Sequence, residues 1–280
     1  MTHPAFTSSS VAVVTGGASG IGLASATKFA AMGMRVAIVD RAQDRHTAAE
    51  DALRAAGAAD VMTAATDVSD RAQVEALETE VTDRFGGADI LMNNAGIGMR
   101  SSATGGLAPW EATLGVNLWG PIHATQVFAP GMIARGRPGL IVNTGSKQGI
   151  TTPPGNPAYN VSKAALKSFT EALSHELRNS ENAQLTAHLL IPGFVHTAMI
   201  GAKEKPAAAW TADQTAAFFV DSVNNGDFYI LCPDNDVPRP LDERRIAWAV
   251  GDIIENRPAL SRWHPDYADA FAAFVDGAKG

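Results

Sequence analysis

Short apolar segments alternate along the chain with longer segments in which alanines and charged residues recur at helical spacing. The apolar segments are rich in Val, Ile and Leu, and apolar residues run through them without polar alternation, which is typical of strands buried on both faces of a parallel sheet. We expect strands at 11–15, 35–39, 61–65, 90–92, 140–143, 185–191 and 228–231. Long intervening helices suit right-handed crossovers. The pattern predicts an α/β fold, namely a Rossmann-like doubly wound parallel sheet of about seven strands with helices on both faces.

The helical pattern covers 21–32, 44–56, 71–85, 109–135, a segment from about 157, and 242–255. No internal repeat or low-complexity linker interrupts it, so we expect a single dinucleotide-binding domain over 1–280. Residues 194–225 contain helix-like stretches without a strand, and we interpret them as a substrate lid. A C-terminal extension, 257–280, carries four aromatic residues at near-helical spacing. This tail packs either over the pocket of its own or a neighbouring subunit, or on the outer face of the domain.

Composition narrows the class of protein. A formal net charge of −7 and the lack of a long basic run exclude a typical nucleic-acid binder. The single cysteine, Cys232, favours a reducing compartment. The first ten residues lack the pattern of a signal peptide, and no run approaches about 20 apolar residues. We therefore expect a cytoplasmic protein without a membrane segment. No cluster of His, Cys or acidic residues has metal-ligand spacing, so we expect no catalytic metal.

A glycine-rich loop joins the first strand to the first helix. Its glycines, Gly16, Gly20 and Gly22, permit a tight turn and the close approach of a pyrophosphate to the helix N-terminus. The alternative is an ordinary tight turn. Asp40 ends the second strand, where a carboxylate accepts hydrogen bonds from the adenosine ribose and repels a 2′-phosphate. This favours NAD, although Arg41 beside it could recruit the phosphate of NADP.

Tyr159 and Lys163 stand four residues apart in a predicted helix, so both side chains project from one face. An ammonium beside a phenol favours the phenolate, and we expect Lys163 to lower the pKa of Tyr159. The pair could then move a proton to or from oxygen.

Taken together, these residues resemble the short-chain dehydrogenase/reductase family. The motifs that carry the resemblance lie in family order between residues 10 and about 200: Thr15-Gly-x-x-x-Gly-x-Gly22, Asp67-Val68, Asn93-Asn-Ala-Gly96, Asn117, Ser146, Tyr159-x-x-x-Lys163 and Pro192-Gly193. The glycine spacing differs from that of the extended branch, which includes the nucleotide-sugar epimerases.

The resemblance implies a role for each matching position. Asn117, Ser146, Tyr159 and Lys163 would be catalytic, with Ser146 bonding the substrate oxygen and Asn117 anchoring a water that reaches Lys163. The implied cofactor-binding set is Gly16, Ser19, Gly20, Ile21, Gly22, Asp40, Arg41, Asp67, Val68, Asn94, Ala95, Gly96, Tyr159, Lys163, Pro192, Gly193, Val195 and Thr197. Candidate substrate contacts are Ser146, Gln148, Pro153, Tyr159, Phe194 and Met199.

The sequence therefore predicts an NAD-dependent oxidoreductase that interconverts a secondary alcohol and a ketone on a small, apolar or aromatic substrate. One alternative is an NADP-dependent carbonyl reductase, and another is a sensor that binds a dinucleotide without turnover. We interpret Lys147 and Arg100 as solvated surface cations. If either side chain points into the substrate site, an anionic substrate is favoured. We expect a homodimer or homotetramer.

Overall fold

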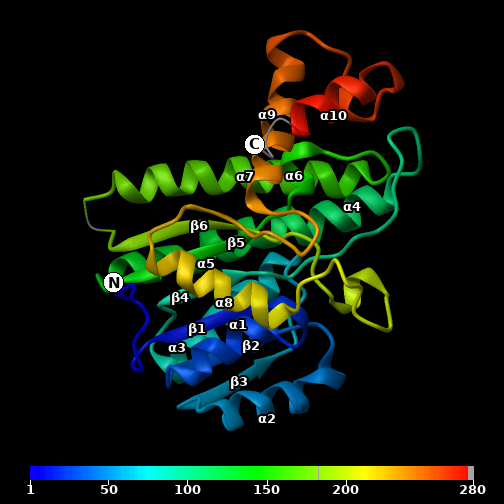
Figure 1. Ribbon diagram of the computed structural model, residues 1–280. Helices are drawn as coiled ribbons and strands as arrows, with labels where there is room; N and C mark the ends of the chain where they lie inside the picture. Colours follow the sequence, from blue (N-terminus) through cyan, green and yellow to red (C-terminus); the bar gives the residue numbers. More distant parts are fainter. Residues whose placement is uncertain (182, 277–280) are drawn as a thin grey trace.

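Seven parallel strands form one sheet at the centre of the molecule (Figure 1). The computed structural model describes residues 1–181 and 183–276. The strands lie in the order β3-β2-β1-β4-β5-β6-β7, with bounds β1 Val11–Thr15, β2 Arg35–Val39, β3 Asp60–Ala64, β4 Ile90–Asn93, β5 Gly139–Thr144, β6 Leu185–Ile191 and β7 Tyr229–Leu231. Every neighbouring pair is parallel. The predicted doubly wound α/β sheet is confirmed.

Helices cover both faces of this sheet. Their bounds are α1 Gly20–Ala31, α2 His46–Ala56, α3 Arg71–Phe85, α4 Ala108–Leu114, α5 Gly120–Ala134, α6 Gln148–Thr151, α7 Pro157–Arg178, α8 Ala212–Asn224, α9 Arg239–Ile254 and α10 Ala268–Asp276. Short 3₁₀ turns occur at η1 Gln43–Arg45, η3 Ala198–Ile200, η4 Ser261–Trp263 and η5 Pro265–Tyr267. None of the helices that the structure describes is long and apolar enough to cross a membrane.

The core consists of two apolar layers, one on each face of the sheet. Phe29 of α1, Leu53 of α2 and Phe219 of α8 are fully buried against one face. On the other face, Leu77 of α3 and Phe128 of α5 are buried together with residues of α7. Because apolar layers cover both faces of the sheet, the central strands are mostly apolar, as the sequence pattern indicated.

The predicted continuous helix over 109–135 is wrong in its middle. A five-residue π-helical segment, η2 (Gly115–Trp119), separates α4 from α5. Pro121 has no N–H, so the carbonyl of Asn117 cannot receive the usual bond from four residues ahead. Instead, the N–H of Gly120 donates to the carbonyl of Gly115, five residues earlier. The widened turn places Asn117 inside the molecule, fully buried.

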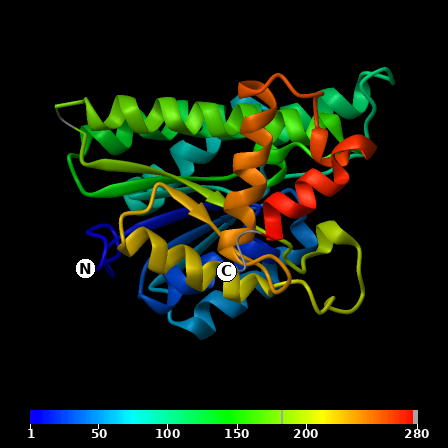
Figure 2. The same ribbon diagram turned by 45° about the horizontal axis from the view of Figure 1, so that its top comes forward.

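The C-terminal helices extend the fold beyond the sheet. Figure 2 shows α9 and α10, in orange and red, lying side by side. α9 begins three residues before the predicted start, at Arg239, and contacts α6 beside the sheet. Residues 277–280 of the predicted extension lie outside the described residues. The interpretation of 194–225 as a lid stays a prediction. That segment holds η3, α8 and a single parallel bridge between Val195 and Trp210.

Candidate active site

The candidate residues gather at the carboxyl ends of the central strands. β1 lies between β2 and β4, so the chain crosses the sheet in opposite directions on the two sides of β1. At such a reversal the loops after the strands separate and leave a crevice in which α/β proteins bind ligands. The glycine loop follows β1, Asp40 follows β2, Asn94 follows β4 and Ser146 follows β5.

The glycine loop is closely packed on the loop after β4. Gly16 has φ +61, and a Cβ there would lie 2.9 Å from the Cα of Ala95. A Cβ on Gly22 would lie 2.2 Å from the carbonyl oxygen of Gly16 and 2.5 Å from the Asn94 side chain. Both positions therefore require glycine. The loop is shaped to bring backbone N–H groups close to a phosphate.

The start of α1 leaves its first amides available to a ligand. Ser19 is the N-cap residue, yet its side chain makes no capping hydrogen bond to the helix. Free N–H groups and the positive end of the helix dipole suit an anion. Gly20, with φ +54, faces Thr197, because a Cβ at Gly20 would lie 3.2 Å from the threonine methyl group. The fold thus brings the loop after β6 against the glycine loop.

Asp40 sits where the adenosine ribose is expected. Its carboxylate accepts the N–H of Ala18 at 3.3 Å and that of Ala42 at 3.0 Å. Arg41 is mostly exposed and approaches Asp67 at 3.4 Å. A second guanidinium, which sequence reasoning missed, belongs to Arg45 and donates to the Ser19 hydroxyl at 3.4 Å. Asp40 opposes a 2′-phosphate, whereas two arginines stand near enough to attract one.

Two other candidate cofactor positions, Asn94 and Asp67, lie in hydrogen-bonded loops at the strand ends. The Asn94 side chain donates to the carbonyls of Thr15 and Gly16 at 3.2 and 3.3 Å, and it accepts from Thr144 at 3.4 Å. Asn94 therefore ties β1 to β5 across β4. The Asp67 carboxylate accepts the backbone N–H and the hydroxyl of Ser69, and these bonds hold the pKa of Asp67 below its usual range.

The Tyr159 phenol lies at the start of α7, beside Ser146. Burial raises the pKa of Tyr159, and a hydrogen bond with the Ser146 side chain offsets part of that rise. The prediction that Lys163 lowers this pKa is wrong here. Desolvation by burial is the main influence on this pKa, and the Lys163 Nζ lies 5.8 Å from the centre of the Tyr159 ring. Tyr159 consequently holds its proton at neutral pH.

Lys163 is buried on the same face of α7, one turn later. Its ammonium donates to the carbonyl oxygen of Thr144 at 2.7 Å, a contact that the sequence did not indicate. Burial lowers the pKa of Lys163 from 10.5 to about 8. The backbone at Gly149 packs against Lys163 so closely that a Cβ there would lie 2.5 Å from the lysine carbonyl carbon. α6 therefore fixes the turn of α7 that carries Lys163.

Asn117 joins the π-helical segment to the site. Its Oδ1 accepts from the N–H of Ile97 at 2.8 Å, and its Nδ2 donates to the Ile97 carbonyl at 2.9 Å. Nδ2 also reaches the Ser162 hydroxyl at 3.2 Å, next to Lys163. Asn117 thus lies in a distorted turn and faces the candidate catalytic helix, and its catalytic role stays a prediction.

The candidate substrate residues other than Ser146 and Tyr159 lie in two segments, one between β5 and α7 and one after β6. Gln148 is exposed at the start of α6, and Pro153 follows α6 on the way to α7. Phe194 and Met199, in the loop after β6, expose 39% and 54% of their surface. Such exposure of large apolar side chains leaves them available to a ligand.

The interpretation of Lys147 as a solvated surface cation is wrong. Its ammonium lies 2.5 Å from Asp242 and 3.3 Å from Asp234, and its side chain is only 19% exposed. The two carboxylates were not part of the predicted site, because they lie some 90 residues further along the chain. Arg100, by contrast, is exposed.

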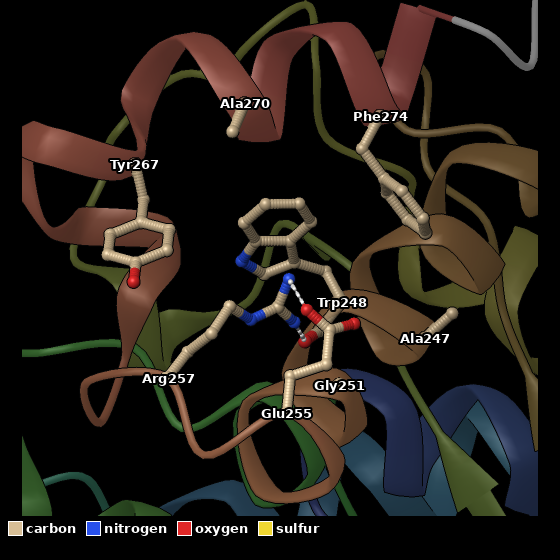
Figure 3. A pocket seen from close by; sticks show the side chains of 8 residues that line it. All are labelled: Ala247, Trp248, Gly251, Glu255, Arg257, Tyr267, Ala270 and Phe274. Carbon is tan, nitrogen blue, oxygen red and sulfur yellow. Dashed lines mark hydrogen bonds and ion pairs between the residues drawn. The ribbon is translucent and has the colours of Figure 1, made fainter.

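The aromatic tail packs on α9 of its own chain. Figure 3 shows Tyr267, Ala270 and Phe274 facing Trp248, Arg257 and Glu255 across a hollow of about 390 Å³. The Trp248 ring meets Phe271 and Phe274 at 5.4 and 5.3 Å between centres. The lining of this hollow includes none of the candidate catalytic residues. Within the described residues the tail therefore contacts α9 of its own chain, and both alternatives for its packing stay predictions.

The chain is similar to known proteins in both sequence and fold. The family model described as short chain dehydrogenase matches residues 10–208. A 1-deoxy-11-beta-hydroxypentalenate dehydrogenase of Streptomyces avermitilis is 31% identical over 251 residues, covering 85% of this chain and 90% of the relative. A short-chain dehydrogenase/reductase from Burkholderia phymatum, solved in complex with NAD, has a TM-score of 0.81 and 32% identity over 89% of this chain and 95% of its own. A metagenomic short-chain oxidoreductase in complex with NADP has a TM-score of 0.67 and 31% identity, covering 81% and 97% of the two chains.

Proposed function

The chain belongs to the short-chain dehydrogenase/reductase family, and we propose that it is an NAD-dependent oxidoreductase interconverting a secondary alcohol and a ketone. Membership of the family implies that the protein is an oxidoreductase and that its cofactor is a nicotinamide dinucleotide. The choice of NAD, the alcohol substrate and the residue roles are our proposal. The observation that carries it is the meeting of Tyr159, Ser146 and Lys163 beside the glycine loop.

In the proposed reaction Tyr159 exchanges a proton with the substrate oxygen. During oxidation the phenolate form of Tyr159 accepts the hydroxyl proton of the alcohol, and during reduction the phenol returns that proton to the ketone oxygen. NAD⁺ supplies the hydride acceptor. The Ser146 hydroxyl donates to the substrate oxygen and stabilises the charge that develops there. Lys163, whose ammonium donates to the Thr144 carbonyl, would hold the nicotinamide ribose, and Asn117 would anchor a water that reaches Lys163.

Asp40 supports NAD over NADP. Its carboxylate stands at the end of β2, hydrogen-bonded to the backbone at Ala18 within the glycine loop. A 2′-phosphate beside it would meet a like charge. The positions of Arg41 and Arg45 near the glycine loop favour the second candidate, an NADP-dependent carbonyl reductase, because a guanidinium attracts a phosphate.

Exposed apolar side chains support an apolar or aromatic substrate. Met99 and Leu107 lie in the loop before α4, and Phe194, Met199 and Ile200 lie in the loop after β6. The first loop reaches Tyr159, because a Cβ on Gly98 would lie 4.0 Å from the phenol ring. We propose that residues 194–225 act as the lid over such a substrate. We also propose that the protein forms a homo-oligomer and is located in the cytoplasm.

The proposal is tested by incubating the protein with NAD and each member of a panel of secondary alcohols and measuring the appearance of NADH. Tyr159→Phe keeps the ring and removes the proton carrier. This variant should lose turnover while its affinity for NADH stays close to wild type. A variant that turns over like wild type would refute the role of Tyr159. Tight NADH binding by the wild type without turnover of any alcohol or ketone would favour the sensor alternative.

A further inference from the structure

A buried group of three charges adjoins the candidate site and has no role in the reaction proposed above. The ammonium of Lys147, the residue after Ser146, lies 3.3 Å from Asp234 Oδ2 and 2.5 Å from Asp242 Oδ2. Each carboxylate side chain is 5% exposed. We call these three residues the charge clamp.

The charge clamp connects four separate segments of the chain. Lys147 belongs to the loop between β5 and α6, and Asp234 belongs to the loop after β7. Asp242 lies in the first turn of α9, where the helix dipole favours a carboxylate. The fourth segment is the loop after β6, because the Phe194 N–H donates to Asp234 Oδ2 at 3.1 Å. A single ammonium thus holds together loops on two sides of the candidate substrate pocket.

The surroundings leave this arrangement little freedom. A Cβ on Gly193 would lie 2.7 Å from Asp234 Oδ2 and 2.9 Å from the Lys147 ammonium. A small hollow of about 50 Å³ adjoins the clamp, and Arg245 of α9 and Arg262 of η4 line it together with Lys147 and Asp242. Charged side chains from the loop before α6, the loop after β7, α9 and the tail therefore lie close together at this point.

Stability alone is a poor reason for such a cluster. Transfer of charges from water is costly, and well-packed apolar residues of similar volume often stabilise a fold equally well. What a buried ion cluster can add is a fixed geometry, since the ammonium must stay where both carboxylates reach it. Here the fixed points are the backbone next to Ser146 and the backbone of Phe194.

We propose that Lys147, Asp234 and Asp242 position Ser146 and Phe194 for the reaction, so that the anchoring of α9 controls the geometry of the active site. Lys147 is a positioning residue in this scheme, because its ammonium is directed at the two carboxylates and acts through Ser146. The inference rests on the proposed function, since it assigns Ser146 to the substrate oxygen.

The decisive variant is Lys147→Met, which keeps the length of the side chain and removes its charge. A displacement of about 1 Å at a reacting group can cost about 100-fold in rate, so we expect kcat to fall about 10- to 100-fold. The glycine loop and Asp40 are not attached to the clamp, whereas Gly193 of the cofactor-binding set adjoins it, so NADH affinity should fall less than kcat does. Amide hydrogen exchange in the peptide around Phe194 should accelerate, because its N–H loses a fixed acceptor.

Asp242→Asn and Arg84→Met complete the set. Asp242→Asn keeps the shape of the side chain and weakens only the link to α9, so a smaller fall in kcat is expected. Arg84→Met removes an ion pair of similar length, 2.8 Å to Asp60, which joins α3 to β3 away from the clamp and from the proposed lid. This control should keep the wild-type kcat. All variants are assayed with NAD and 1-phenylethanol as the probe alcohol, and thermal melting verifies that each is folded.

The outcomes separate this inference from the proposed function. If Lys147→Met folds and keeps kcat within about twofold of wild type, with unchanged exchange at Phe194, the positioning role is refuted. If Lys147→Met does not fold, Asp242→Asn decides, and a wild-type kcat in that variant refutes the inference. Tyr159→Phe, run beside them, tests the acid-base assignment independently of the clamp. The exchange measurement needs no turnover, so it decides on the clamp even if 1-phenylethanol is not oxidised.

Discussion

The buried ammonium of Lys163 makes the stability of this protein depend on pH in a specific way. Burial lowers its pKa in the folded state from 10.5 to about 8. In the unfolded chain the ordinary value applies, so between these two pH values the unfolded state binds more protons than the folded state. Under that condition stability rises with pH. Below about pH 8, by contrast, the folded protein bears the full cost of a charged, desolvated lysine.

The size of the effect follows from the shift. One pKa unit corresponds to about 1.4 kcal/mol, so the full cost of the buried charge is about 3 kcal/mol. Between pH 7 and 9.5, about 2 kcal/mol of this cost should be relieved as Lys163 loses its proton. Lys163→Met removes the titration, so the free energy of unfolding of the wild type should gain about 2 kcal/mol relative to the variant over this range.

Urea unfolding of both proteins at several pH values measures this difference. The slope with pH is more informative than a value at one pH, because the variant also loses the hydrogen bond to the Thr144 carbonyl. Lys167→Met is the matched control, since Lys167 lies on the same helix with about a third of its side chain exposed. The free energy of unfolding of this control should change with pH in the same way as that of the wild type. If the free energy of unfolding of Lys163→Met also follows the wild type with pH, Lys163 is solvated, and the account of its environment is wrong.

Three further predictions follow from the site. Asp40→Ala should raise the ratio of kcat/KM for NADP over NAD about 10- to 100-fold by removing a like charge near the 2′-phosphate, and an unchanged ratio would remove the basis for preferring NAD. Gly193→Ala should destabilise the protein by about 1–3 kcal/mol in urea unfolding, since its methyl group would meet Asp234 and Lys147; wild-type stability would contradict the packing described. Because the pKa of Tyr159 is raised, kcat/KM for oxidation should increase toward alkaline pH while that for reduction decreases, and a flat profile for both directions would exclude Tyr159 as the proton carrier.

The sheet could be predicted from the sequence because each strand carries its own signal. Burial on both faces makes a strand apolar along its length, and the segment 11–15 shows this in its first four residues, which are all apolar and buried. The glycine loop was predictable for a similar reason, since a tight turn and close backbone contact restrict positions such as Gly16 to one residue type.

Contacts between distant segments carry no comparable signal. A lysine is usually a surface residue, and nothing near Lys147 in the sequence indicates that two aspartates surround its ammonium. The pKa of Tyr159 depends on desolvation, which spacing along a helix does not report. The break in the helix at Gly115–Trp119 had a local signal in Pro121, because a proline in a helix interior removes a backbone hydrogen bond.

The central claim is that Tyr159 is the acid-base group of an NAD-dependent oxidoreductase. The most direct test is single-turnover formation of NADH by wild type and Tyr159→Phe, both saturated with NAD and a secondary alcohol that the wild type oxidises. Loss of a general acid-base group should slow the step by about 100-fold or more while NADH affinity, followed by fluorescence, is unchanged. Equal single-turnover rates for the two proteins would contradict the account.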